Sequence, residues 1–245
     1  MDLVALDERF LSKPGFAMEL CRTAANSMAR ETEKGILLSM DLLHTYNKDI
    51  EKDIHYYETM VDLYEDKLGA YLVRLSSNDL SKQDSQTLTQ LLHCMSDFER
   101  ISDHTISICK VAREIEEHKF SKEASMELDV LISSIHTIVD NTTQCFIHRD
   151  LTQAKQIEPL RRAIDQIVLS IRKRHIKRVR NKQCTIELGI VLEDLMIDLE
   201  RIAGHCSNIA IALLQITEDE LEAHTYVKSN EFEENKDSNK EIKLL

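Results

Sequence analysis

The chain has 245 residues but only 5 Gly and 2 Pro, so it cannot form the many tight turns that β-sandwiches, barrels and glycine-loop nucleotide folds require. Its 42% apolar and 30% charged residues are typical of a folded globular chain rather than a disordered one. A formal net charge of -12 argues against a protein whose main role is to bind nucleic acid.

Cysteine usage and hydropathy indicate the compartment. The six cysteines are scattered without a CxxC pair, and a chain of this size does not need disulfide bonds to fold. A reducing cytoplasm is therefore expected. The sequence contains neither an uninterrupted apolar run of the roughly 20 residues that span a bilayer nor a signal-peptide pattern at its start.

The first long helix is predicted to begin at Pro14, with Ser12 as its candidate cap. Apolar residues then recur at spacings of three and four as far as a polar break near Tyr46 and Asn47. The chain continues with a second helix to about 75, a loop at 76–84 with candidate caps at Asp79 and Ser81, and a third helix at about 82–117.

A second set of three helices is expected at about 121–149, 152–181 and 183–215. The third helix of each set carries a similar octet, DFERISDH at 97–104 and DLERIAGH at 198–205, with five identical residues in eight at a constant offset of 101. This repetition indicates a tandem duplication of a three-helix unit.

The predicted fold is therefore all-α, a tandem pair of three-helix bundles made of six long antiparallel helices. The expected divisions are repeat 1 at 1–118, repeat 2 at 119–215, and a tail at 216–245. The tail loses the apolar periodicity and becomes polar and acidic, so a frayed helix followed by a mobile segment is expected there.

Four acids of the first repeat lie on helix faces that they share with apolar residues. Glu99 and Asp103 are four residues apart and point the same way as Leu92 and Ile106. Glu58 and Asp62 repeat the spacing on the second helix, followed one turn later by Glu65. Both pairs are therefore expected to point inward, between neighbouring helices.

Carboxylates at such short separations repel one another by a few kcal/mol at an effective dielectric constant near 20. Arginine or lysine partners, shared protons or a hard cation would remove this repulsion, and we favour a metal ion. A ferritin-like di-iron centre is disfavoured, because no histidine follows a glutamate by three residues; only Asp41 and His44 come close.

The octet at 97–104, the segment ETMVD at 58–62 and DLERIAGHCSNIA at 198–210 resemble the PhoU family. Three further segments are similar to the PhoU-like C-terminal region of bacterial sodium/phosphate cotransporters: 5–20, 61–76 and 174–184. The resemblance covers roughly residues 5–215. It implies a PhoU-like pair of bundles and a regulator of phosphate uptake rather than an enzyme.

In that family each repeat carries an E(D)xxxD motif that binds metal clusters. Carried over, Glu58, Asp62, Glu99 and Asp103 are the expected metal ligands of the first repeat. The cation would be divalent or trivalent (iron, zinc, manganese or magnesium), and the sequence does not distinguish among these.

The second repeat departs from the family pattern at two positions, so its site is expected to be degenerate. Asp165 and Glu200 remain, but Arg161 and Gly204 stand where the family has acids. Arg161 is expected to neutralise Asp165 and Glu200 as an internal ion pair. One metal site is therefore expected rather than two.

Arg100 and Arg201 follow the repeated glutamates, and two interpretations are equally open: each orients a carboxylate ligand, or each forms an ordinary salt bridge. His104 and His205 are expected to be packed polar residues rather than ligands. Cys206 is expected to fill the core.

A basic run extends from Arg172 to Lys182. Its charges spread around the helix, which favours a solvated helix end; contact with the anionic inner leaflet or with phosphate-bearing ligands is the alternative. No aromatic residue is interleaved, so nucleic-acid stacking has little support.

The first functional hypothesis is a cytoplasmic regulatory domain of a sodium-dependent phosphate cotransporter, whose full-length protein lies in the inner membrane. The second is a free-standing PhoU-type adaptor. Expected partners are a transporter domain of the same chain or a separate phosphate transporter, and a second copy of the chain. An enzyme is not expected, because no nucleophile and base arrangement or phosphate loop is present.

Overall fold

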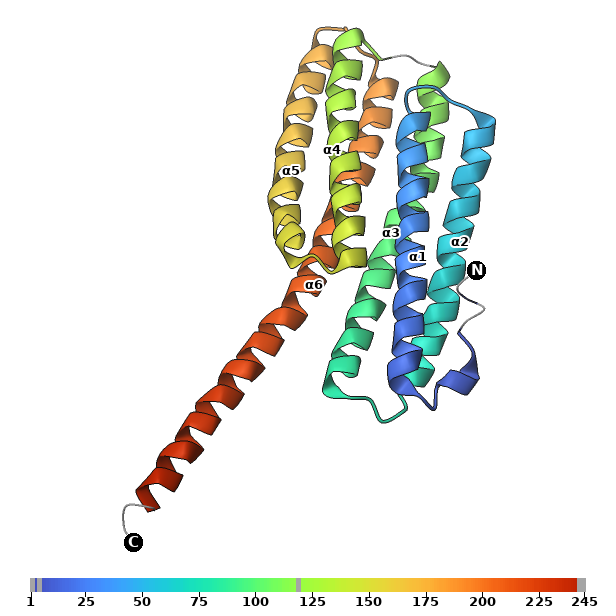
Figure 1. Cartoon of the computed structure of the whole chain (residues 1–245). Coiled ribbons are helices and arrows are strands. Elements are labelled where there is room, and N and C mark those ends of the chain that lie inside the picture. The colour runs from blue at the N-terminus through green and yellow to red at the C-terminus, as the bar shows by residue number, and fades with distance from the viewer. Residues whose placement is uncertain (1–2, 4–5, 118–119, 242–245) are drawn as a thin grey trace.

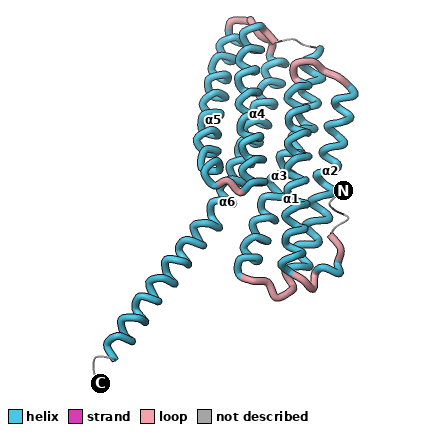
Figure 2. Tube along the Cα trace, viewed as in Figure 1, coloured by secondary structure: helices cyan, strands magenta, loops and turns pink. Residues whose placement is uncertain are grey.

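The computed structural model describes the chain except residues 1–2, 4–5, 118–119 and 242–245, and in the last helix it describes side chains as far as Gln215. A short 3-10 helix, η2 (Glu8–Phe10), precedes six helices, which short loops connect (Figure 2). The six are α1 (Pro14–Leu42), α2 (Lys48–Leu75), α3 (Lys82–Glu117), α4 (Lys122–His148), α5 (Leu151–Arg180) and α6 (Ile186–Glu241).

The helices form two antiparallel three-helix bundles, α1 to α3 and α4 to α6, which lie side by side (Figure 1). The bundles meet where α3 packs against α6 and α1 packs against α4. Buried apolar side chains of both bundles form one continuous core. The all-α fold with two tandem three-helix units is thus confirmed. The expected boundary at 118/119 lies outside the described residues.

Side-chain caps fix most of the helix starts. The Asn47 side chain accepts a hydrogen bond from the Asp49 amide at 2.8 Å, and the Ser81 hydroxyl accepts one from the Asp84 amide at 3.0 Å. The predicted cap at Ser12 is wrong. Lys13 is the N-cap of α1 without a side-chain bond. Ser12 lies one residue before it, and its hydroxyl donates to the Arg9 carbonyl at 3.2 Å.

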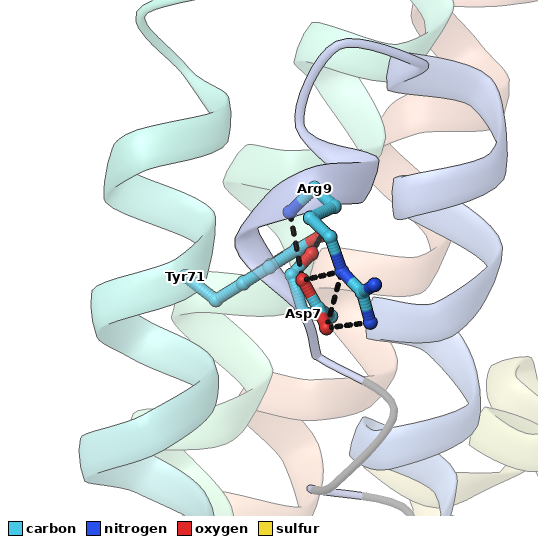
Figure 3. A network of polar contacts seen from close by, with 3 residues as sticks. All are labelled: Asp7, Arg9 and Tyr71. Carbon is cyan, nitrogen blue, oxygen red and sulfur yellow. Dashed lines mark hydrogen bonds and ion pairs between the residues drawn. The ribbon is translucent and has the colours of Figure 1, made fainter.

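The N-terminal segment is attached to α2 by polar contacts (Figure 3). The Asp7 carboxylate accepts hydrogen bonds from the Arg9 amide at 2.9 Å and from the Arg9 guanidinium at 2.6 Å. The Tyr71 hydroxyl donates to the Asp7 carbonyl at 3.2 Å. These contacts hold η2 against the end of the first bundle, next to the start of α1.

The backbone of α6 leaves the second bundle and continues as a single projecting helix (Figure 1). The predicted mobile tail at 216–245 stays a prediction, because its side chains and residues 242–245 lie outside the described part of the chain. Within the described residues, no helix combines the length and apolar character that crossing a bilayer requires.

Candidate metal site

The seam between α2 and α3 brings three predicted ligands together. One carboxylate oxygen each from Glu58, Asp62 and Asp103 lies within 4.8 Å of the other two. Oxygen ligands bind hard cations at about 2.0–2.6 Å, so small side-chain rotations would let a single ion contact all three. The donor set therefore fits a divalent or trivalent cation, and the geometry does not choose among them.

The expected inward orientation of these acids is only partly right. Glu58 and Glu99 are half-buried, but Asp62 and Asp103 are exposed. On α3 the apolar neighbours Leu92 and Ile106, which share the direction of Glu99 and Asp103, are themselves only partly buried. The acids therefore line the rim of the α2–α3 seam rather than its interior.

Glu99 lies beside the three grouped carboxylates rather than among them. Burial raises its pKa to about 7, and the next contributions are the charges of Asp103 and Glu65 and a hydrogen bond with Asp103. Burial and then neighbouring carboxylates also raise the pKa values of Glu58, Asp62 and Glu65. We call these five residues the acidic cluster.

Repulsion within the acidic cluster is not balanced by an internal ion pair. The charge of Arg100 only partly offsets the raised pKa of Glu65. Among the described residues, neither Arg100 nor Arg201 forms an ion pair or hydrogen bond with a carboxylate, so neither of the two expected arrangements is observed. A bound cation or retained protons would relieve the repulsion.

The corresponding acids of the second repeat are neutralised by arginines. Arg161 Nη2 lies 3.3 Å from Asp165 Oδ2, as expected. Glu200, however, pairs with Arg172, whose Nη1 and Nη2 lie 3.2 and 2.7 Å from its two oxygens. The predicted pairing of Arg161 with Glu200 is therefore wrong, because the Glu200 carboxylate faces Arg172, which lies further along α5.

Glu58, Asp62 and Asp103 form the one group among the described residues whose donor atoms are arranged as a metal site requires. Neither Asp165 nor Glu200 belongs to such a group. The assignment of Glu58, Asp62, Glu99 and Asp103 as ligands stays a prediction, as does the degenerate character of the second site.

The two octets meet at the α3–α6 interface in a reciprocal arrangement that the sequence did not reveal. His205 Nδ1 lies 2.8 Å from Asp97 Oδ1, and His104 Nδ1 lies 2.9 Å from Asp198 Oδ1. The two imidazole rings stack at a centroid distance of 6.1 Å. Both histidines are thus packed polar residues, as expected, and each one bonds to the aspartate of the other repeat. Cys206 is buried in the core as predicted.

Three arginines of the basic run form ion pairs within the protein. Arg172 pairs with Glu193 as well as Glu200, and Arg174 and Arg178 both pair with Glu127 of α4. Glu127 gives no signal in the sequence, because nothing in the local spacing shows which helix will face α5. Lysines and Arg180 of the run stay exposed, and inner-leaflet contact stays a prediction.

Fold and sequence together define the class of the protein. The PhoU domain matches residues 25–112 and 130–213, one match in each bundle, so the chain belongs to the PhoU family. It is 25% identical over 200 residues to the phosphate-specific transport system accessory protein PhoU homolog 1 of Thermotoga maritima, covering 82% of this chain and 77% of that protein.

Two crystal structures have the same fold. PhoU from Pseudomonas aeruginosa superposes with a TM-score of 0.77 at 17% identity, covering 82% of this chain and 97% of that one. The phosphate transport system regulatory protein PhoU from Streptococcus pneumoniae gives a TM-score of 0.74 at 17% identity, covering 82% and 95%. At this level of identity the likeness extends to the fold alone.

Proposed function

We propose that this protein is a PhoU-type accessory regulator of phosphate transport, which acts in the cytoplasm by contacting a phosphate transporter rather than by catalysis. The match of the PhoU domain to both repeats carries the proposal. The name of the Thermotoga maritima relative, an accessory protein of a phosphate-specific transport system, supports it.

The relatives reported above are named as PhoU proteins rather than as transporters, which favours a separate accessory protein over a cotransporter domain. The reading frame upstream of this segment distinguishes the two. Membrane-spanning helices encoded in frame before it would favour the cotransporter domain, and a separately encoded transporter would favour the accessory protein.

Phosphate uptake is the direct test of the regulatory role. Deleting the coding sequence should change the rate of labelled phosphate uptake and its response to external phosphate, and expression of the intact chain should restore both. Uptake that is the same in deleted and intact cells at both high and low external phosphate would refute the role.

We further propose that the acidic cluster binds a metal ion that holds α2 and α3 together. Protein purified without chelator should contain bound metal by elemental analysis. Replacing Glu99 and Asp103 together by Ala should remove most of it, because the site loses one of its three grouped oxygens and the adjacent carboxyl group.

The matched control is the pair of corresponding positions in the second repeat. Replacing Asp165 and Glu200 together by Ala should leave the metal content largely in place, with circular dichroism confirming that both double variants are helical. Metal content that is unchanged in the first double variant would refute the assignment.

A further inference from the structure

A pocket occupies the place in the second repeat that the acidic cluster occupies in the first. It lies between α5 and α6 and has a volume of about 620 Å³. Arg161 stands at the position of Glu58, and Gly204 stands at the position of Asp103. Between the two repeats the charge is thus reversed at the first of these positions and lost at the second.

Gly204 leaves the pocket open on the α6 side. A Cβ atom built at this position meets no heavy atom within 4 Å, so the space beside the helix is not filled by a neighbouring side chain. A side chain like that of Asp103, the counterpart of Gly204 in the first repeat, would project into this space. With glycine here, the pocket lacks both that side chain and its negative charge.

Three guanidinium groups line the pocket, those of Arg161, Arg162 and Arg201. Glu158 is the one acid among the lining residues, and its two oxygens are already engaged: Oε1 accepts from Arg162 Nε at 2.9 Å and Oε2 accepts from the Ser207 hydroxyl at 2.6 Å. Hydrogen bonds from Ser207 and then Arg162 lower the pKa of Glu158.

The positive charge of the pocket therefore exceeds its negative charge, even when Asp165 beside Arg161 is included. Within the described residues Arg201 has no hydrogen-bond or ion-pair partner, and it lines the pocket next to Gly204. A planar guanidinium with free donors favours oxyanions that accept two parallel hydrogen bonds.

We propose that this pocket binds a tetrahedral oxyanion, namely phosphate, either as the free inorganic ion or as a phosphomonoester. Arg201 and the terminal nitrogens of Arg162 donate to it, and Arg161, whose terminal nitrogens pair with Glu158 and Asp165, adds positive charge beside it. The site is independent of the metal at the acidic cluster, and it stands whether or not the protein regulates transport.

Isothermal titration of the full-length protein with inorganic phosphate in the presence of EDTA tests this site. A saturable isotherm with a dissociation constant of about 1 mM or tighter is expected, since a few charge-assisted hydrogen bonds supply that affinity. A parallel titration with phosphoserine distinguishes the two ligands. Tighter binding of inorganic phosphate indicates the free ion, and tighter binding of phosphoserine indicates a phosphorylated group.

Two variants locate the binding. Arg201→Ala should weaken it about tenfold or more, and Gly204→Asp should abolish it by returning the acid into open space. Arg100→Ala, at the matching position of the first repeat, is the control and should leave binding unchanged. The proposal would be overturned by a titration of the unaltered protein that does not saturate, or by binding that occurs only when EDTA is left out. Equal effects of Arg100→Ala and Arg201→Ala would also overturn it.

Discussion

Glu33 on α1 is a carboxyl group that the fold holds near neutral pH. Burial raises its pKa from 4.5 to about 7, and the charge of Asp140 on α4 and a hydrogen bond with it add to the rise. The native state therefore binds the Glu33 proton more tightly than the unfolded chain does. Its contribution to stability is fully present below pH 4.5 and is lost as the pH rises through 7.

Replacing Glu33 by Gln should flatten the pH dependence of stability. For the unaltered protein, the Glu33 contribution to the free energy of unfolding should fall by about 1–2 kcal/mol between the two pKa values, allowing for partial solvent screening. Urea denaturation at a series of pH values measures this change.

Asp140→Asn provides a second variant, because removing the neighbouring charge should lower the Glu33 pKa and narrow the pH window. A decline of the same size in the unaltered protein and in Glu33→Gln would show that other groups cause it.

At the scale of single residues, the sequence predicted which side chains gather but not how deeply they lie. The four-residue spacing of Glu58 and Asp62 placed them on one helix face, as the structure has them. Their exposure depends on how far α3 covers α2, which local spacing does not contain. For the same reason the partner of Glu200 was assigned to Arg161 instead of Arg172.

At the scale of helices, α5 and α6 carry the changes that distinguish the second site from the first. Replacing Arg161 by Glu and Gly204 by Asp together would restore the acids that correspond to Glu58 and Asp103. The double variant should bind about one additional metal ion per chain, because Gly204 leaves open space for the new carboxylate.

Elemental analysis against the unaltered protein measures this gain. Arg162→Glu with Gly204→Asp is the control, since it introduces the same charges but places one of them a residue away from the matching position. An equal gain in both variants would mean that added negative charge alone attracts the metal.

The sequence predicts best where helices occur and where they begin and end. The predicted range of 82–117 for the third helix agrees with α3, because a long apolar stripe and a capping serine mark both its path and its start. The predicted cap of α1 is wrong, since Ser12 lies one residue before the N-cap position, which Lys13 occupies.

At the scale of the whole molecule, the reciprocal Asp–His pairs join the two bundles. Asp97 and Asp198 are each less than a tenth exposed, so losing the histidine removes a hydrogen bond from a buried carboxylate. Asp97 then keeps the longer bond from Asn208 Nδ2 at 3.2 Å. A double-mutant cycle of Asp97→Asn and His205→Ala should give a coupling energy of about 1–3 kcal/mol in urea denaturation.

The exposed Asp49–Lys52 pair, 2.8 Å apart on α2, is the control for this cycle. Its coupling energy should be much smaller than that of the Asp97–His205 pair, because both side chains are well solvated. Equal coupling energies in the two cycles would show that the Asp97–His205 contact does not hold the bundles together.

The duplication itself was visible in the sequence as the repeated octets, but the contact between them was not. A constant offset shows that two segments are equivalent. It does not show that equivalent segments touch, which depends on α3 lying against α6.

Because each octet supplies an aspartate to the other and receives one in return, the contact is isologous: the same patch serves on both sides. A single three-helix unit would then expose Asp97 and His104 as a self-complementary surface. Two such units, expressed apart, would be expected to associate about a twofold axis through the same residues, so the linked chain is in effect a dimer whose halves have been joined into one polypeptide.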